Sequence, residues 1–238
     1  MADSSLMATV VNIFASPAEA FRAIKERPRA FLPWALVIAS TVTVTVLYIN
    51  LVDFAWFMEQ QLRSSNAAQN MTDAQLEQAI TAASNTPRGV IAAAAGISTP
   101  IALTLIWFVF ALYFKVVSSI TRDGIRLKQW FSLICWCSLP VLLSSLATLV
   151  NLLTNDVSLM PQTKVNPLSY SSLFNIEPTG TNIFFRILQS FDLTSIWALV
   201  LTVLGYQNWT GKSLTTAAAI ALAPYALVLG LGLLVSFL

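Results

Sequence analysis

Long stretches without a charged residue alternate along the chain with shorter polar segments. Five of these stretches stand out, and they cover residues 30–52, 89–114, 129–155, 193–211 and 213–238. A transmembrane helix needs about 20 mostly apolar residues to cross roughly 30 Å of hydrocarbon. The pattern therefore predicts an all-α fold, a polytopic integral membrane bundle of five transmembrane helices.

The limits of the uncharged stretches predict where the five helices begin and end. We expect spans at about residues 31–52, 90–117, 130–153, 183–206 and 214–237. The apolar part of the fourth stretch, Leu193 to Tyr206, is too short to cross the bilayer by itself. That helix is therefore expected to begin near Asn182 and to take in charged residues.

A short amphipathic helix is expected before the first span. Ser16 and Glu19 have the spacing of a capping box, and Pro17 would occupy the first helical turn. The helix would end at about Arg27. Its apolar face would consist of Ala20, Phe21 and Ile24.

Four basic side chains accompany this helix, namely Arg22, Lys25, Arg27 and Arg29. One interpretation is a helix lying on the membrane surface, with these four side chains in contact with lipid. The other is a solvated basic flank that only sets the topology. In both cases residues 1–30 are expected to form a short amphipathic cytoplasmic segment, followed by a five-span membrane domain at residues 31–238.

The distribution of Lys and Arg predicts the orientation, because cytoplasmic segments of membrane proteins carry an excess of both. If the N-terminus is inside, nine basic residues lie on the cytoplasmic side, namely Arg22, Lys25, Arg27, Arg29, Lys115, Arg122, Arg126, Lys128 and Lys212. Four lie on the outer side, namely Arg63, Arg88, Lys164 and Arg186. Five spans then put the C-terminus outside.

Two loops on the expected outer side are long. Within residues 53–88 a helix is expected from Thr72 to Ala83, with Thr72 as its N-cap and Asp73 in its first turn. Residues 154–181 contain three prolines and a glycine and are expected to be irregular. Loops of this length are uncommon as simple connections, so we expect them to pack over the end of the bundle.

The composition agrees with a membrane protein. Apolar residues make up 56% of the chain and charged residues 10%, whereas an average soluble domain is about 25% charged. The net charge of +2 is too small to indicate nucleic-acid binding. No signal peptide is expected, because the stretch from Leu6 to Phe14 is short and runs into a helix start, with no cleavage site.

Few residues could carry chemistry. The chain has no histidine, which removes the commonest general base and the commonest metal ligand. Cys135 and Cys137 lie two residues apart in an apolar stretch and are expected as free buried thiols, with neither a disulfide nor a metal between them. We therefore expect no catalytic residues, no cofactor, no metal and no enzymatic activity.

Polar residues inside the bilayer are costly and often functional, so the fourth span is the main candidate site. Asp192 lies between Phe191 and Leu193, within the length that this helix needs. Arg186 and Gln189 precede it and would form a loose polar stripe with it. Two roles remain open: a structural pairing that orients the helix, or the handling of protons or ions.

Four motifs in order along the chain point to a known family, namely Ile13-Phe14-Ala15-Ser16-Pro17, Val52-Asp53-Phe54-Ala55-Trp56-Phe57, Ser138-Leu139-Pro140-Val141 and Ala223-Pro224-Tyr225. Together they resemble the bacterial branch of the Ypt-interacting protein (YIP) family. The resemblance implies five spans and a cytoplasmic N-terminal segment. Its eukaryotic relatives are implied to contact Rab-type small GTPases. This chain lacks their Asp-Leu-x-Gly-Pro stretch, so no functional residue is carried over.

These observations predict a non-enzymatic integral protein of the bacterial inner (plasma) membrane that organises membrane lipid or binds a protein partner, or a second copy of itself. The alternative is a transporter or channel for a small solute, proton or lipid, with a polar path at Asp192 and Arg186. A wet cavity that reaches Asp192 would favour transport, and dry packing around a paired Asp192 would favour the first role.

Overall fold

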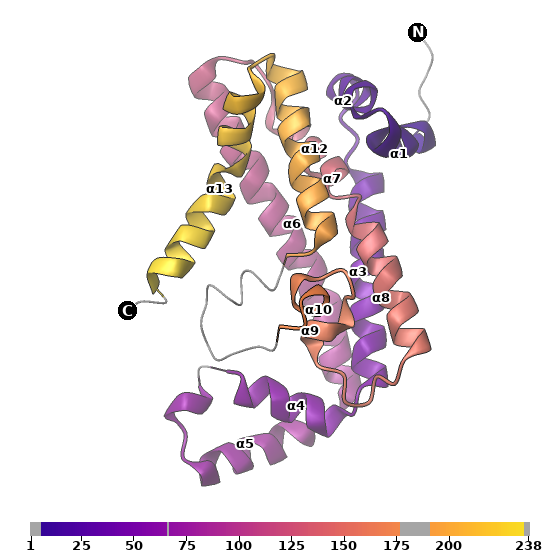
Figure 1. Ribbon diagram of the computed structural model, residues 1–238, viewed down its shortest axis with the longest axis vertical. Coiled ribbons are helices and arrows are strands. Elements are labelled where there is room, and N and C mark those ends of the chain that lie inside the picture. Colours follow the sequence, from indigo (N-terminus) through magenta and orange to yellow (C-terminus); the bar gives the residue numbers. More distant parts are fainter. Residues whose placement is uncertain (1–5, 66, 177–190, 236–238) are drawn as a thin grey trace. The chain divides into compact units, whose positions relative to one another are not determined.

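The computed structural model describes residues 6–65, 67–176 and 191–235 and consists of helices joined by turns and short irregular segments (Figure 1). The longer helices are α3 (Phe31–Leu51), α6 (Arg88–Thr121), α7 (Leu127–Cys137), α8 (Val141–Thr154), α12 (Leu193–Thr210) and α13 (Leu214–Val235). The shorter ones are α1 (Leu6–Ala15), α2 (Pro17–Glu26), α4 (Phe54–Arg63), α5 (Asp73–Ser84), α9 (Gln162–Val165) and α10 (Tyr170–Leu173), with a 3-10 turn at Ala68–Asn70.

Four helical segments in the described part are long and apolar enough to cross a membrane, namely Phe31–Leu51, Arg88–Thr121, Leu127–Thr154 and Leu214–Leu234. They coincide with the first, second, third and fifth predicted spans. The third is interrupted after Cys137, where Pro140 supplies no N–H for a helical bond, and it resumes at Val141. The predicted count of five depends on the remaining helix, α12.

Helix α12 departs from its prediction at its N-terminal end. Asp192 forms an isolated bridge with Ser169 and lies just before the helix, which begins at Leu193. The expectation that this helix includes Asp192 is therefore wrong. The expected residues Arg186 and Gln189 lie outside the described residues. At its other end α12 continues to Thr210, so its 18 residues rise about 27 Å, close to the thickness of a hydrocarbon core.

The chain divides into two compact units. Unit 1 comprises residues 1–39, 101–143 and 194–228, and unit 2 comprises residues 40–100, 144–193 and 229–238. All nine basic residues predicted for the cytoplasmic side belong to unit 1. Arg63, Arg88 and Lys164, predicted for the outer side, belong to unit 2.

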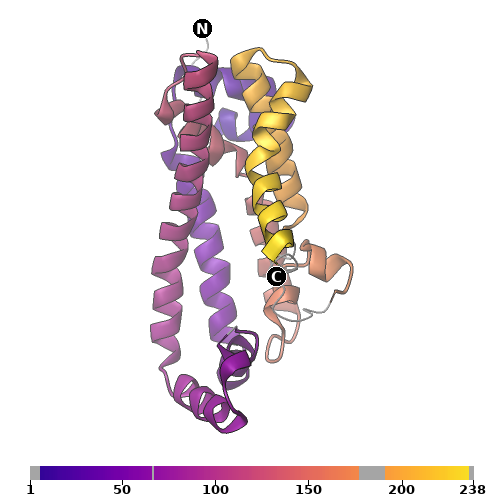
Figure 2. The ribbon, with the colours of Figure 1, turned by 90° about the vertical axis from the view of Figure 1, so that its left-hand side faces the viewer.

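Unit 1 holds the larger apolar core. In it α12 leads into α13 through a turn at Gly211, whose φ of +69° favours glycine (Figures 1 and 2). The core is rich in aromatic rings, and Trp130 stacks on Tyr206 with their ring centroids 5.5 Å apart. Phe114 and Trp209 complete this aromatic cluster, at 5.2 and 5.3 Å from Trp130.

Unit 2 has a smaller core around Tyr48, Phe57 and Leu152. Helix α4 follows α3 directly and packs against α5 before the chain enters α6 (Figure 2). The N-cap of α5 is Thr72, as predicted, and its hydroxyl and the Gln75 side chain form a complete capping box. The loop expected to be irregular, residues 154–181, contains α9 and α10 in its described part.

Candidate functional site

Helix α2 forms as predicted, but its start differs from the expected capping box. The Ser16 side chain makes no capping hydrogen bond. The backbone N–H of Ser16 instead donates to Asn12 O at 2.8 Å, which closes the preceding helix α1. Because α1 runs almost directly into α2, Ser16 ends one helix as it starts the next, and the capping-box prediction is wrong.

The apolar face of α2 is covered by protein. Ala20, Phe21 and Ile24 are at most 2% exposed and belong to the core that contains Trp130 and Tyr206. The close fit depends on Gly205 in α12, where a Cβ atom would lie 3.2 Å from the Phe21 ring. The predicted apolar face of α2 is thus the face that packs against the rest of unit 1.

Side chains from α7 and α12 hold α2 by its backbone carbonyls. Trp209 Nε1 donates to Phe21 O at 2.8 Å, and Gln129 Nε2 donates to Lys25 O at 2.9 Å. In the segment that follows, Trp136 Nε1 donates to Arg29 O at 3.0 Å. Lys25 O lies in the last turn of α2, where backbone carbonyls have no partner within the helix.

The four predicted lipid-contacting residues separate into two groups. Lys25 is half-buried and its Nζ donates to Trp209 O at 2.6 Å, which places its charge at the C-terminus of α12, where a cation is favourable. Arg22, Arg27 and Arg29 are exposed. Their contact with lipid stays a prediction, and only these three present their side chains outward.

Helix α1 adds an apolar surface that the sequence interpretation missed. Met7 is 71% exposed and Val11 is 62% exposed, one turn apart on the same face. The opposite side of α1 packs on the core through Ile13, which is fully buried. The apolar stretch before Ser16 indicates such a surface, but the sequence interpretation used it only to argue against a signal peptide.

A second polar group in unit 1 lies where α12 turns into α13. Lys212 Nζ lies 3.3 Å from Asp123 Oδ2, and Lys212 also stands over the Tyr206 ring at 5.9 Å from its centroid. Asp123 in turn accepts a hydrogen bond from Thr121. Both side chains of the ion pair are largely buried, and they tie the α6–α7 connection to the α12–α13 turn.

In unit 2, Asp192 is the centre of a small hydrogen-bond network. Its Oδ2 accepts from Ser144 Oγ at 2.5 Å and from Asn166 Nδ2 at 2.9 Å. Asn166 Nδ2 also reaches Ser144 Oγ at 2.8 Å. Hydrogen bonds to a carboxylate are stronger than those between neutral groups, so this network fixes the start of α12 to α8 and to the loop at Asn166.

Sequence reasoning identified Asp192 but neither of these partners. Ser144 is one of several hydroxyl residues in the third span, and Asn166 lies in a proline-containing loop, so neither had a distinguishing pattern. A proton- or ion-handling role for Asp192 stays a prediction. Within the described ranges, no group of three or more His, Cys, Asp and Glu side chains is arranged to hold a metal ion.

Comparisons with known proteins find a family and a relative of this chain. A family model described as the Yip1 domain matches residues 11–237. The chain is 30% identical over 208 residues to "Membrane protein YknW" of Bacillus subtilis (strain 168), and the match covers 86% of this chain and 80% of that protein. No solved structure matches the chain.

Proposed function

Because the chain belongs to the Yip1 domain family and is a multi-pass membrane protein, we propose that it is a non-enzymatic protein that organises membrane lipid or binds a protein partner at the inner face of the bacterial plasma membrane. In this proposal α12 is the fourth of five spans, the N-terminus is cytoplasmic and the C-terminus is outside. The excess of Lys and Arg in the segments predicted to be cytoplasmic supports that orientation.

One observation carries the proposal: the N-terminal segment is a docked surface that combines exposed apolar and basic side chains. Met7 and Val11 are apolar and exposed, and Arg22, Arg27 and Arg29 are basic and exposed. Apolar side chains that enter the headgroup region, next to cations that attract anionic lipid, are what interfacial helices provide. Since α2 is fixed to the spanning helices, this surface moves with the membrane domain.

The test uses the whole protein in lipid nanodiscs that contain phosphatidylcholine with a minor fraction of spin-labelled phosphatidylglycerol. The measured quantity is the preference of the protein for the anionic lipid. A variant with Arg22→Gln, Arg27→Gln and Arg29→Gln should lose about fivefold of this preference for each charge removed. An unchanged preference would refute lipid contact by this segment.

A matched variant separates this role from the effect of charge alone. Arg122, Arg126 and Lys128 are also exposed, belong to the same unit and lie outside the N-terminal segment. Changing these three to Gln removes the same charge. If both triple variants lose the preference equally, the N-terminal residues are only a basic flank that sets topology.

Crosslinking from α1 distinguishes lipid from a protein partner. A photoreactive amino acid in place of Met7 would react with whatever covers that exposed side chain in the cell membrane. Lipid adducts support the lipid-organising role, and one defined protein adduct supports a partner. An adduct with a second copy of this chain supports a homo-oligomer.

The alternative role is transport along a polar path at Asp192 and Arg186. The hydrogen bonds from Ser144 and Asn166 favour a structural role for Asp192, because both donate to the same carboxylate oxygen. Proteoliposomes test the alternative directly. If wild-type protein carries protons or a solute and Asp192→Asn abolishes the flux without loss of folded protein, transport replaces the proposal.

A further inference from the structure

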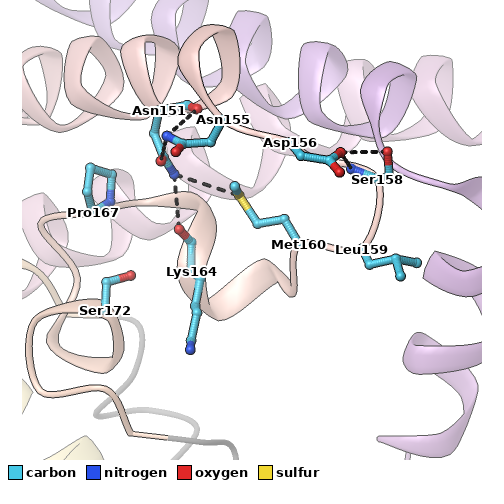
Figure 3. A pocket seen from close by; sticks show the side chains of 9 residues that line it. All are labelled: Asn151, Asn155, Asp156, Ser158, Leu159, Met160, Lys164, Pro167 and Ser172. Atoms are coloured by element: carbon cyan, nitrogen blue, oxygen red, sulfur yellow. Dashed lines mark hydrogen bonds between the residues drawn. The ribbon is translucent and has the colours of Figure 1, made fainter.

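The segment from the end of α8 to α10 lines an open cavity in unit 2 of about 630 Å³ (Figure 3). It is lined by Asn151, Asn155, Asp156, Ser158, Leu159, Met160, Lys164, Pro167 and Ser172. Binding sites for small molecules usually measure about 300–1,000 Å³. The cavity therefore has room for a ligand, and its lining contains one carboxylate and one ammonium group.

Asp156 supplies the negative charge. Its Oδ1 accepts hydrogen bonds from the backbone N–H and the hydroxyl of Ser158, at 2.9 and 2.7 Å. These bonds lower the pKa of Asp156, so the carboxylate stays ionised. Ser158 O accepts from the backbone N–H of Asp53 at 2.8 Å, which anchors the turn to the end of α3. Among the described residues, Asp156 Oδ2 receives no hydrogen bond.

Lys164 supplies the positive charge from the other side of the turn. Its Nζ donates to Asn175 Oδ1 at 2.9 Å. Its backbone is held in place by Asn151, whose Nδ2 donates to Lys164 O at 3.1 Å and to Val165 O at 2.9 Å. Figure 3 shows Asp156 beside Ser158 and Lys164 separated from them by Met160. Asp156 and Lys164 thus line one cavity from different segments of the turn.

A ligand that complements this lining carries both a cation and an anion. The acceptors at this end of the cavity, Asp156 Oδ2 and the side-chain amide oxygen of Asn155, favour a primary ammonium group, which can donate hydrogen bonds. A quaternary ammonium is recognised by aromatic rings, and none of the described residues that line the cavity is aromatic. The phosphate or carboxylate of the ligand would lie toward Lys164.

The surroundings of the cavity favour a lipid as the source of this zwitterion. Leu159 lines the cavity and is 62% exposed, and Phe174 on the same loop is 66% exposed. Leu173 is also exposed. Exposed apolar and aromatic side chains next to a polar cavity match the headgroup region, where one end of a lipid is polar and the other apolar.

We propose that this cavity binds the phosphoethanolamine headgroup of phosphatidylethanolamine, with Asp156 receiving the ammonium group and Lys164 the phosphate. The proposal deepens the lipid-organising role and rests on it for the choice of a lipid over a solute. It uses a site in the other unit from the basic N-terminal segment. A failure here would therefore leave the test with phosphatidylglycerol intact.

The experiment measures lipid binding to the full-length protein, purified in detergent, by native mass spectrometry. Phosphatidylethanolamine and phosphatidylcholine with identical acyl chains are offered in equal amounts, so that only the ammonium group differs. Asp156→Asn and Lys164→Gln each remove one charge. Asp73→Asn and Lys128→Gln remove the same charges at exposed positions outside the cavity and serve as matched controls.

We expect wild type and both controls to prefer phosphatidylethanolamine at least about threefold. Asp156→Asn should abolish the preference, and Lys164→Gln should weaken binding of both lipids. Soluble phosphoethanolamine is the second arm: if it binds and Asp156→Asn removes this binding, but no lipid is preferred, a solute is the source and the lipid proposal is overturned. Equal binding of both lipids by wild type, with no binding of the soluble compound, also overturns it.

Discussion

A methyl group added at Gly205 tests the idea that close contact with α12 sets the position of α2. In the structure a Cβ at this position would lie 2.7 Å from Leu133 Cδ1 and 3.2 Å from Phe21 Cε1. Carbon atoms in contact prefer separations of about 3.5–4.0 Å. Leu133 and Phe21 are both fully buried, so neither side chain can move away into solvent or lipid.

Two opposing effects determine how Gly205→Ala changes the free energy of unfolding. Overpacking a filled core costs about 1–3 kcal/mol. Replacing glycine by alanine inside a helix returns about 1 kcal/mol. Gly230→Ala in α13 receives only the second effect, because no atom lies within 4 Å of the added methyl group. The free energy of unfolding of the two variants should therefore differ by about 1–3 kcal/mol, with Gly205→Ala the less stable.

The buried thiols supply the assay. Cys135 and Cys137 are at most 1% exposed and belong to the same core. Their labelling by a thiol-reactive dye, measured as SDS is added to mixed micelles, reports the unfolding of unit 1, and circular dichroism of the same samples reports the loss of helix in both units, which include Gly230. Leu133→Ala in the Gly205→Ala background tests the contact itself, because the two changes should couple by about 1 kcal/mol or more. Equal stability of the two glycine variants, without such coupling, would refute the reasoning.

The other predictions concern single contacts. Trp209→Phe removes the hydrogen bond to Phe21 O and should lower the stability of unit 1 by about 1 kcal/mol. Trp197→Phe changes an exposed side chain and should leave the stability unchanged. Thiol labelling measures the stability of both variants. Asn166→Ala should raise hydrogen exchange at the start of α12, whereas Asn50→Ala, an exposed control, should leave it unchanged. Thr72→Ala breaks the capping box and should fray α5, by about 1 kcal/mol in local exchange, without a change in global unfolding because α5 buries no residue. The pKa of Asp156 lies below its usual 3.8, so its contribution to phosphoethanolamine binding is present above that pH and lost as the pH falls through the lowered pKa; a loss of preference already at neutral pH would contradict this.

Sequence reasoning found the spanning helices because their apolar length is a local property that the bilayer sets. The same reasoning missed α4, since its ten residues mix apolar and charged side chains and are too short to cross. It also placed Asp192 inside a helix, because the length rule takes no account of a neighbouring loop. Asp192 instead forms a backbone bridge with Ser169, and its carboxylate accepts hydrogen bonds from Ser144 and Asn166. No pattern along the chain predicts these contacts.

The N-terminal segment shows most clearly what the sequence alone could not predict. Periodicity identified Ala20, Phe21 and Ile24 as one apolar face, which is what the structure has. It could not tell whether lipid or protein covers that face, because both are apolar. In the structure protein covers it. The covering residues include Trp209, about 185 positions away, whose indole N–H donates to Phe21 O. Lys25 also contacts Trp209, through its bond to Trp209 O, and in this it differs from the three exposed arginines.

The way α2 is held has an optical consequence. Three of the seven tryptophans, Trp130, Trp136 and Trp209, are at most 4% exposed, and two of them donate their indole N–H to carbonyls of α2 and the segment after it. Release of α2 would let water reach these rings and shift their emission to longer wavelength. The protein thus reports the state of its N-terminal segment by its own fluorescence, and a ligand or partner that lifts α2 can be detected without any added label.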